Sequence, residues 1–387
     1  MAGGRGGGGG RNGVIEFPIP TMPISFRSVL AALSACLLVP VLALAQGAPT
    51  KTPSETTAEA EATIRAGVDL HDKGQFDEAI AKYQEVLTKT PGDINALFEL
   101  AYSYLSKREF DRAFDTAKKG SEYKSELLPM FYDLMASSLD SKGQPQQAVD
   151  MYKKGIALAP DAAQLYFNMA VTYRESLSQP DDARLALQKA VALEPLHPGA
   201  HVLLGQVFQS SGYTAPAFFA LSTFLVIDPA GSQALPAYGL WRAVLKGGVE
   251  TIPPAQGAPM RAPAAAAARK TDEGDFRTFE NQLAPSFEAF SKKLDAGTPE
   301  SQALVEQVDR LLGTLPATAT GPAATSFVNR HYVPFFLALR AQGHVEPFVY
   351  WASQRAPVPG VVDWLKGNET RVRAFLEWAS KYEWPAN

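Results

Sequence analysis

The sequence predicts an all-α protein, in which an α-solenoid of helix–turn–helix units is followed by a C-terminal α-helical domain. The first observation is an alanine that recurs every 34 or 35 residues, in step with other small and aromatic residues. The second is a glycine or a proline near the ends of most of the segments that carry it. A fixed period of this size marks an array of stacked repeats. The recurring alanines are Ala79, Ala113, Ala148, Ala183 and Ala217.

Each unit is expected to contain two helices that cross closely. In the first unit, Ala79, Tyr83 and Val86 are four and three residues apart, so they share one face of the second helix. A small residue is needed at each crossing, because a larger side chain would separate the two backbones. The small residues of the first helices are Gly67, Ala101, Ala136, Ala170 and Gly205. The large residues that fill the space between neighbouring units are Tyr83, Tyr152, Leu187 and Leu221.

The turn between the two helices has its own pattern. Gly74, Gly143 and Gly212 are placed to adopt the left-handed conformation that ends the first helix. Prolines then end the second helix of most units. Two units deviate from the pattern. The second has Arg108 at the glycine position, and the fourth has one extra residue near Ser178, which we expect to lengthen only the turn.

These features resemble the tetratricopeptide-repeat family over residues 60–229. The resemblance implies a right-handed superhelix whose first helices line a concave groove that binds a protein or peptide. Carried over unit by unit, it gives these groove residues: Phe98, Tyr102, Leu105, Asp133, Ser137, Asp140, Phe167, Val171, Arg174 and Gln206. Half of them are aromatic or aliphatic, and two are acidic, which suits a peptide with apolar anchors and a basic residue.

Some members of the family hold a C-terminal carboxylate in this groove with lysine, asparagine and arginine side chains. Only Asn168 and Arg174 match that arrangement here, and the lysines are missing. We therefore do not expect a carboxylate clamp.

Residues 232–246 are predicted to form the first helix of an incomplete sixth unit, which ends an array covering residues 60–246. A capping helix normally has a polar outer face. This one carries Trp241, Val244 and Leu245. We therefore expect the C-terminal region to cover it.

The N-terminal region is typical of a secretory signal peptide. Arg27 precedes an apolar run over residues 29–45, which ends in a small-residue site at Ala43 and Ala45. We predict a signal peptide within residues 1–45, a true translation start at Met22, cleavage after Ala45, and a periplasmic or secreted protein. Residues 46–59 are expected to form a flexible linker.

Two alternatives involve the membrane. The apolar run is 17 residues long and would be a short anchor if it were not cleaved. Cys36 lies in a sequence that resembles a bacterial lipobox, so its lipidation would make the protein a lipoprotein of the cell envelope. Contact with a membrane is expected only through one of these two routes.

Charge and cysteine content narrow the function classes. The full chain has a formal net charge of −4, and removal of residues 1–45 takes away three arginines and one glutamate, which leaves −6. A mildly acidic chain is a poor candidate for binding nucleic acid. Cys36 is the only cysteine, so the mature chain would have neither a disulfide nor a cysteine nucleophile.

Composition changes after the array. Residues 247–275 are rich in proline, alanine and glycine, as in a linker, and residues 276–387 are rich in aromatic residues. We predict helices over residues 276–294, after an N-cap at Thr298, over residues 324–342, around Phe348, and after an N-cap at Asn368. This region is either a divergent continuation of the array or a separate bundle.

Catalytic and metal-binding patterns are weak. His197 and His201 have a suggestive spacing, but Pro198 and Gly199 between them indicate a helix start, so we expect no metal site. We also expect no catalytic residues and no cofactor. The leading hypothesis is a non-catalytic exported adaptor that binds a protein or peptide.

The alternative hypotheses are an enzyme and a lipid-anchored assembly factor of the envelope. In the enzyme, His331 and His344, joined by Asp363 and Glu377, would form the active site of the C-terminal domain. If the groove does not bind the partner, the next candidate residues are Phe335, Phe336, Trp351 and Trp364.

Overall fold

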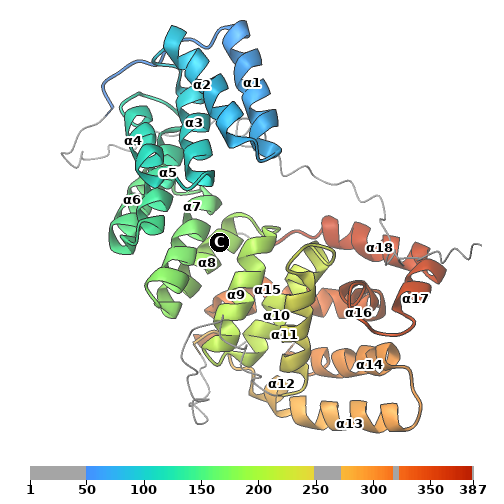
Figure 1. The fold of residues 1–387 in the computed structure, drawn as a ribbon. Helices are drawn as coiled ribbons and strands as arrows, with labels where there is room; N and C mark the ends of the chain where they lie inside the picture. Colours follow the sequence, from blue (N-terminus) through green and yellow to red (C-terminus); the bar gives the residue numbers. More distant parts are fainter. Residues whose placement is uncertain (1–48, 248–271, 317–321, 386–387) are drawn as a thin grey trace, which may run out of the picture. The chain divides into compact units, whose positions relative to one another are not determined.

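The computed structural model describes residues 49–247, 272–316 and 322–385, which belong to one compact unit (Figure 1). The protein is an all-α solenoid, and the described residues contain one isolated β-bridge and no longer strand. The expected signal peptide, the start at Met22, Cys36 and most of the predicted linker after the array lie outside the described residues. No helix in the described ranges has both the length and the apolar character needed to cross a membrane.

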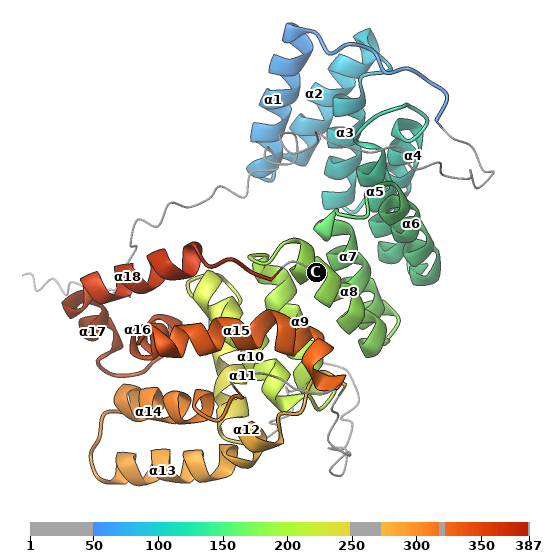
Figure 2. The ribbon, with the colours of Figure 1, turned by 180° about the vertical axis from the view of Figure 1, so that it is seen from behind.

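The recurring pattern forms five consecutive helix pairs, each followed directly by the next. Their bounds are α1 Ala58–Asp72 and α2 Phe76–Lys89, α3 Ile94–Ser106 and α4 Phe110–Gly120, α5 Leu128–Ser141 and α6 Pro145–Leu158, α7 Ala163–Val171 and α8 Pro180–Leu193, and α9 Pro198–Ser210 and α10 Thr214–Ile227. The two helices of each pair pack together, and α1, α3, α5 and α7 contact one another in order. The first helices therefore lie side by side along one face of the stack (Figure 2).

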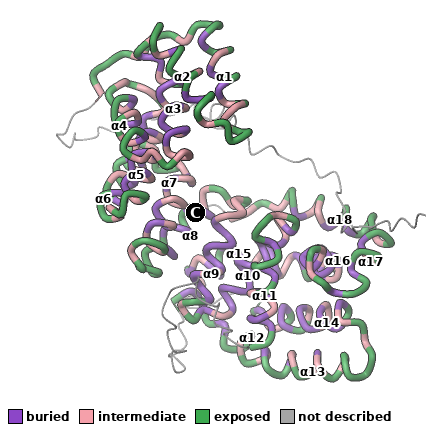
Figure 3. The backbone as a smooth tube through the Cα atoms, viewed as in Figure 1, coloured by how far each residue is buried: buried purple, intermediate pink, exposed green. Residues whose placement is uncertain are grey.

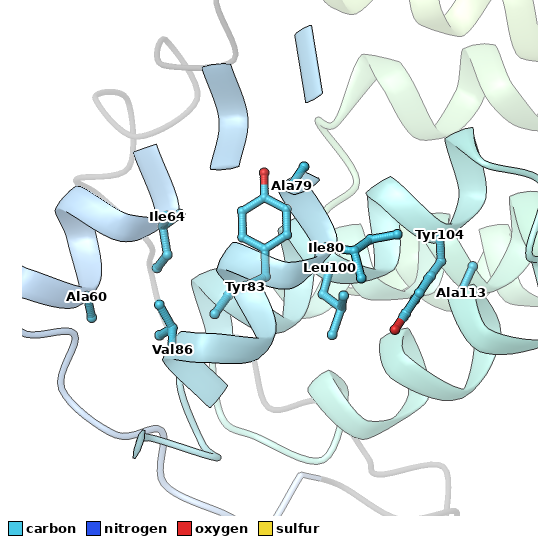
Figure 4. Packing of buried hydrophobic residues seen from close by; sticks show 10 residues of the cluster. Ala60, Ile64, Ala79, Ile80, Tyr83, Val86, Leu100, Tyr104 and Ala113 are labelled. Carbon is cyan, nitrogen blue, oxygen red and sulfur yellow. The ribbon is translucent and has the colours of Figure 1, made fainter. Parts of the chain in front are cut away.

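The helix crossings are as tight as the small residues predict. All five recurring alanines are completely buried. A Cβ atom added to Gly67 would lie 2.5 Å from Cε1 of Tyr83, and one added to Gly205 would lie 2.7 Å from Cγ of Leu221. Figure 4 shows Tyr83 of α2 between Ile64 of α1 and Leu100 of α3. A small residue on the first helix thus makes room for a large one on the second.

The turns repeat one backbone conformation. Gly74, Gly143 and Gly212 have φ of 75°, 74° and 84°, as predicted. Arg108 and Ser178 take the equivalent positions with φ of 65° and 54°. Residues other than glycine rarely adopt a positive φ, so the packing of the flanking helices imposes this backbone conformation at the two turns.

The extra residue of the fourth unit lies in the helix and not in the turn. Gly67 precedes its turn residue Gly74 by seven positions, whereas Ala170 precedes Ser178 by eight. The added residue is taken up by a π-helical turn, η2, over Thr172–Ser176. The expectation that only the turn lengthens is therefore wrong, because the wider helical turn absorbs the residue and leaves the pairing with α8 unchanged.

The segment before α1 is bound to the array and is not a free linker. The amide of Lys51 donates to the carbonyl of Glu122 (3.1 Å), and the amide of Lys124 donates to the carbonyl of Lys51 (2.9 Å). The Thr57 hydroxyl accepts a hydrogen bond from the amide of Ala60 and caps α1. The expected linker over residues 46–59 is thus corrected for its described part, since these backbone groups pair with a loop distant in sequence.

A single helix, α11 Ala234–Leu245, follows the fifth pair in the position predicted for a capping helix. The C-terminal region then adds α12 Arg277–Asn281, α13 Leu283–Asp295, α14 Glu300–Leu312, η3 Pro322–Thr325, α15 Phe327–Ala341, α16 Val345–Ala352, α17 Val361–Gly367 and α18 Glu369–Ser380. The first predicted helix is broken at Gln282, and α17 was not predicted. Asn368 precedes α18, but its side chain donates to the carbonyl of Trp364 and does not cap the helix.

The C-terminal helices cover α10 and α11, as the apolar face of α11 predicts. Every residue of α10 from position 215 to 225 is buried, and a helix that is apolar on all sides belongs in an interior (Figure 3). Trp241 of α11 is fully buried between the rings of Phe218 and Phe348. The Gln307 amide of α14 donates to the carbonyl of Leu245 at 2.9 Å.

A buried ion pair fastens the start of the C-terminal region to the array. Glu273 is 4% exposed, and its carboxylate accepts hydrogen bonds from Arg184 and Gln188 of α8. Its backbone carbonyl accepts one from the hydroxyl of Ser326, which caps α15. This residue belongs to the predicted linker, yet it joins the fourth unit to the C-terminal helices.

The hairpin between α15 and α16 uses the turn of the repeats. The amides of Gly343 and His344 donate to the carbonyls of Arg340 and Leu339, just as those of Gly74 and Gln75 donate to His71 and Leu70. At the two crossing positions, however, this hairpin has Phe336 and Phe348, both fully buried, where the first repeat has Gly67 and Ala79. Helix α16 packs on α14, α10 and α18, and runs in a different direction from α15 (Figure 2).

Candidate functional site: the face formed by the first helices

All ten predicted groove residues are half-buried, which is the exposure expected of a lined surface. They lie on α3, α5, α7 with its π-turn η2, and α9. Since α3, α5 and α7 contact one another in order, the side chains on these three helices form one row across the units, and Gln206 follows on α9. We keep the name groove, which comes from the family resemblance, for the part of this row on α3, α5 and α7–η2.

Aromatic rings dominate the N-terminal end of the groove. The ring of Tyr102 stacks on that of His71 from α1, with centroids 4.8 Å apart, and Phe98 meets Phe131 of α5 edge-on at 5.8 Å. His71 Nδ1 lies 2.7 Å from the hydroxyl oxygen of Ser103. Leu105 packs beside these residues against the same core. Three successive first helices thus present a joined apolar surface.

The two predicted acidic residues occupy the centre and also connect neighbouring units. Asp133 accepts a hydrogen bond from the Asn168 amide at 2.8 Å, and Asp140 accepts one from the Thr172 hydroxyl at 2.9 Å. The second oxygen of Asp140, Oδ1, is buried and has no partner among the described residues. Burial raises the pKa of Asp133 to about 6, and the bond from Asn168 only partly opposes this shift.

Glu99 is a third carboxylate here, and the sequence analysis missed it. It is half-buried on α3 next to Phe98, and burial together with the charge of Asp72 raises its pKa to about 7. Within the described residues, none of the carboxylates of Glu99, Asp133 and Asp140 takes part in an ion pair. The sequence could have indicated Glu99 as a candidate, because it is the only charged residue in the segment that forms α3.

The remaining groove residues have local partners. Ser137 Oγ lies 3.1 Å from the hydroxyl of Tyr152, and Arg174 pairs with Glu175 at 3.0 Å. Phe167 lies 4.7 Å, between ring centroids, from His197 at the start of α9. Val171 is half-buried in the same row. The two residues that match the family's carboxylate clamp, Asn168 and Arg174, are thus paired with Asp133 and Glu175.

The fifth unit is covered by the C-terminal region. His201 of α9 is fully buried; its Nδ1 lies 2.9 Å from the Tyr332 hydroxyl of α15 and its Nε2 lies 2.8 Å from the carbonyl of Pro195. His197 caps α9 by accepting a hydrogen bond from the amide of Ala200. Both histidines therefore have structural partners. Gln206, further along α9, stays half-buried at the end of the row.

The ionisable residues proposed for an enzyme do not meet in the described structure. His344 contacts the rings of Phe375 and Trp378, and Glu377 pairs with Lys381. No hydrogen bond or ion pair among the described residues joins His331 or His344 to Asp363 or Glu377. Within the part of the chain that the structure describes, no group of three or more histidine, cysteine, aspartate or glutamate side chains is suited to a metal ion.

The alternative binding residues of the C-terminal region are mostly core. Phe335, Phe336 and Trp351 are at most 3% exposed, so they cannot anchor a partner in this conformation. Trp364 is half-buried and stacks on Tyr350, with centroids 3.9 Å apart. The prediction that all four are candidate contacts is wrong for Phe336 and Trp351, because these two pack against α10. Phe335 is covered by the ring of Trp384.

Comparison with family models matches three parts of the array. Residues 67–107 match a model described as a TPR repeat, and residues 131–162 and 168–212 match two models described as the tetratricopeptide repeat. The chain contains tetratricopeptide repeats. No curated protein sequence matches significantly.

Several solved structures are similar to about half of this chain. A thermophilic tetratricopeptide protein of Thermus thermophilus is 22% identical, with a TM-score of 0.41, and the match covers 48% of this chain and 98% of that one. PilF of Pseudomonas aeruginosa is 14% identical, with a TM-score of 0.40 and coverage of 48% and 88%. YrrB, described as a tetratricopeptide protein with an unusual peptide-binding site, is 17% identical, with a TM-score of 0.35 and coverage of 48% and 100%.

Proposed function

We propose that the protein is an exported, non-catalytic scaffold that binds a protein or peptide along its groove. The observation that carries the proposal is the row of half-buried side chains on the first helices, in which aromatic rings lie beside carboxylates without a cationic partner. A peptide gains affinity in such a row by burying apolar side chains against the rings.

The chemistry of the centre favours a ligand with a lysine or arginine. Burial raises the pKa values of Glu99 and Asp133, so these groups hold protons more readily than exposed carboxyls do. A cation placed beside them stabilises the ionised forms. Binding of a basic peptide near neutral pH should therefore release protons, and the affinity should fall as the salt concentration rises.

A displayed library of random peptides, selected on the wild-type protein, tests the groove. Enriched peptides should combine aromatic or aliphatic residues with a lysine or arginine. Tyr102→Ala should weaken the best of them by about 1–3 kcal/mol if Tyr102 is a hot spot. Asp140→Asn keeps an acceptor for Thr172 but removes the charge, so it should weaken basic peptides and spare neutral ones.

Asp150→Asn is the matched control, since Asp150 is exposed on the second helix α6 and lies outside the row. Calorimetry gives the affinities of all variants. Full affinity in both groove variants, with their folding unchanged, would place the binding site elsewhere.

Export rests on the N-terminal pattern of Arg27, the apolar run over residues 29–45 and the site at Ala43 and Ala45. The mass of the intact protein purified from an envelope fraction should correspond to a chain that begins at Gln46. A diacylated Cys36 would support the lipoprotein alternative, and an uncleaved N-terminus would contradict export by a cleaved signal.

A further inference from the structure

The chain segment after α18 runs toward α9 (Figure 2), and its Trp384 ring contacts both α15 and α9. The indole of Trp384 stacks on the rings of His331 and Phe335, with centroids 4.8 and 4.9 Å away. These two residues are four apart on α15 and so share one face. Within the described residues, the backbone amides of Glu383 and Trp384 donate no hydrogen bond. The segment is therefore attached through its aromatic side chains and not through secondary structure.

The receiving surface is built from two parts of the molecule. We call it the aromatic slot, and it consists of His201, Phe327, His331, Tyr332 and Phe335. Phe327 stacks on His331 at 4.9 Å, and the Tyr332 hydroxyl lies 2.9 Å from His201 of α9, whose ring centroid is 6.4 Å from that of Trp384. The fifth repeat and the C-terminal helices thus form this slot together.

The slot contains polar nitrogen atoms that form no hydrogen bond with the C-terminal segment that fills it. His331 is 2% exposed, yet neither of its ring nitrogens has a hydrogen-bond partner in the described residues, and the same holds for Nε1 of Trp384. Buried nitrogens in a permanent core are almost always hydrogen-bonded. The two His331 nitrogens and the indole nitrogen of Trp384 thus point to a surface from which Trp384 can be displaced by another side chain.

We propose that the aromatic slot is a peptide-binding site for an extended segment that carries a tryptophan, and that the chain's own C-terminal segment occupies it as a releasable ligand. An indole supplies a large stacking area, and an extended backbone without internal hydrogen bonds keeps its amides and carbonyls available. The occupied slot excludes a second segment. Release of the tail exposes both the slot and Trp384.

Binding of the tail peptide in trans tests this proposal on the full-length chain. The probe is a fluorescein-labelled synthetic peptide of residues 380–387, and its binding is followed by fluorescence anisotropy. Full-length Trp384→Ala should bind this peptide at least tenfold more tightly than the wild type, because its own tail no longer fills the slot. A peptide with the Trp384→Ala change should not bind to either chain.

The control is Trp364→Ala, which removes a half-buried tryptophan outside the slot and should behave as the wild type does. If Trp384→Ala loses the circular dichroism of the wild type, Trp384→Leu replaces it, since leucine keeps apolar volume but cannot stack. A folded variant that fails to bind the peptide would make the tail an ordinary part of the core and overturn the proposal. Equal binding by the wild type and both variants would also overturn it.

Discussion

Replacing His331 by leucine should make the protein less sensitive to acid. His331 is buried between Phe327 and Trp384, and its ring has no hydrogen bond to compensate for a charge. Burial, with a smaller effect of nearby His201, lowers its pKa from 6.5 to about 3. The folded protein therefore holds this ring neutral, whereas the unfolded chain takes up a proton near pH 6.5.

The sign and size of the effect follow from these two values. A depressed histidine pKa gives a stabilisation that is fully present above pH 6.5 and is lost as the pH falls toward 3. Between pH 7 and pH 5, proton uptake by the unfolded chain at this one site removes about 2 kcal/mol from the free energy of unfolding. The leucine variant has no such site, so its stability relative to the wild type should rise by that amount.

The assay is urea unfolding of both chains at pH 7, 6 and 5, followed by circular dichroism. The comparison must be between chains, because Glu99 and Asp133 have raised pKa values and stabilise the folded state as the pH falls. Their contribution and that of His201, whose pKa is lowered to about 4, are common to both chains and largely cancel.

His344→Leu serves as the control, since His344 is only half-buried and should give a smaller difference. Parallel pH profiles for the wild type and His331→Leu, within about 0.5 kcal/mol, would refute the assignment of His331 as a neutral buried group.

Other variants test the packing described above, each by urea or thermal unfolding. Ala148→Leu and Ala183→Leu overfill completely buried crossings and should each cost about 1–3 kcal/mol, so an unchanged melting temperature in both would contradict the crossing model. Gly67→Ala meets Tyr83 at 2.5 Å and should destabilise, whereas Gly239→Ala, in a helix with no atom within 4 Å of the new Cβ, should stabilise by about 0.5–1 kcal/mol; the reverse order would count against the Tyr83 contact. Glu273→Ala leaves Arg184 buried without its main partner and should cost about 3–5 kcal/mol. Asp275→Ala removes an exposed ion pair with Arg277 and a hydrogen bond from the amide of the same residue, so it should change stability far less. Equal effects of these two changes would mean that Glu273 does not fasten the C-terminal region.

The array was predictable because its signals are local and occur five times. Gly74 and Ala79 specify a turn and a helix crossing within six residues. Every later unit repeats the alanine, and the third and fifth units also repeat the glycine. The residues predicted for the groove were chosen with the same register, and they are half-buried. The extra residue of the fourth unit was also visible in the sequence. Its position in the helix was not, because either the helix or the turn could have taken up one more residue, and the structure places it in η2.

Contacts between distant segments were not predictable from these patterns. Lys51 pairs its backbone with the loop at Glu122, and Glu273 inserts its carboxylate beside Arg184, 89 positions away. Neither pairing leaves a period or a motif in the sequence. One such contact was nevertheless predicted, because the apolar outer face of α11 indicated a cover by the C-terminal region. The second helix of the fifth unit, apolar on all sides, gives the same indication.

The hairpin of α15 and α16 shows how the regular stacking of repeats can end. A stack of identical units has an end that matches its beginning, so in principle another molecule can add to it and extend it into a fibre. Among the described residues after the array, the chain makes the repeat turn at Gly297 and again at Gly343. At the second of these turns, Phe336 and Phe348 are fully buried at the positions where the first repeat has its small crossing residues. Rings of this size at both crossing positions are incompatible with the close crossing of a repeat pair, so this hairpin does not add a further repeat of the same geometry to the array.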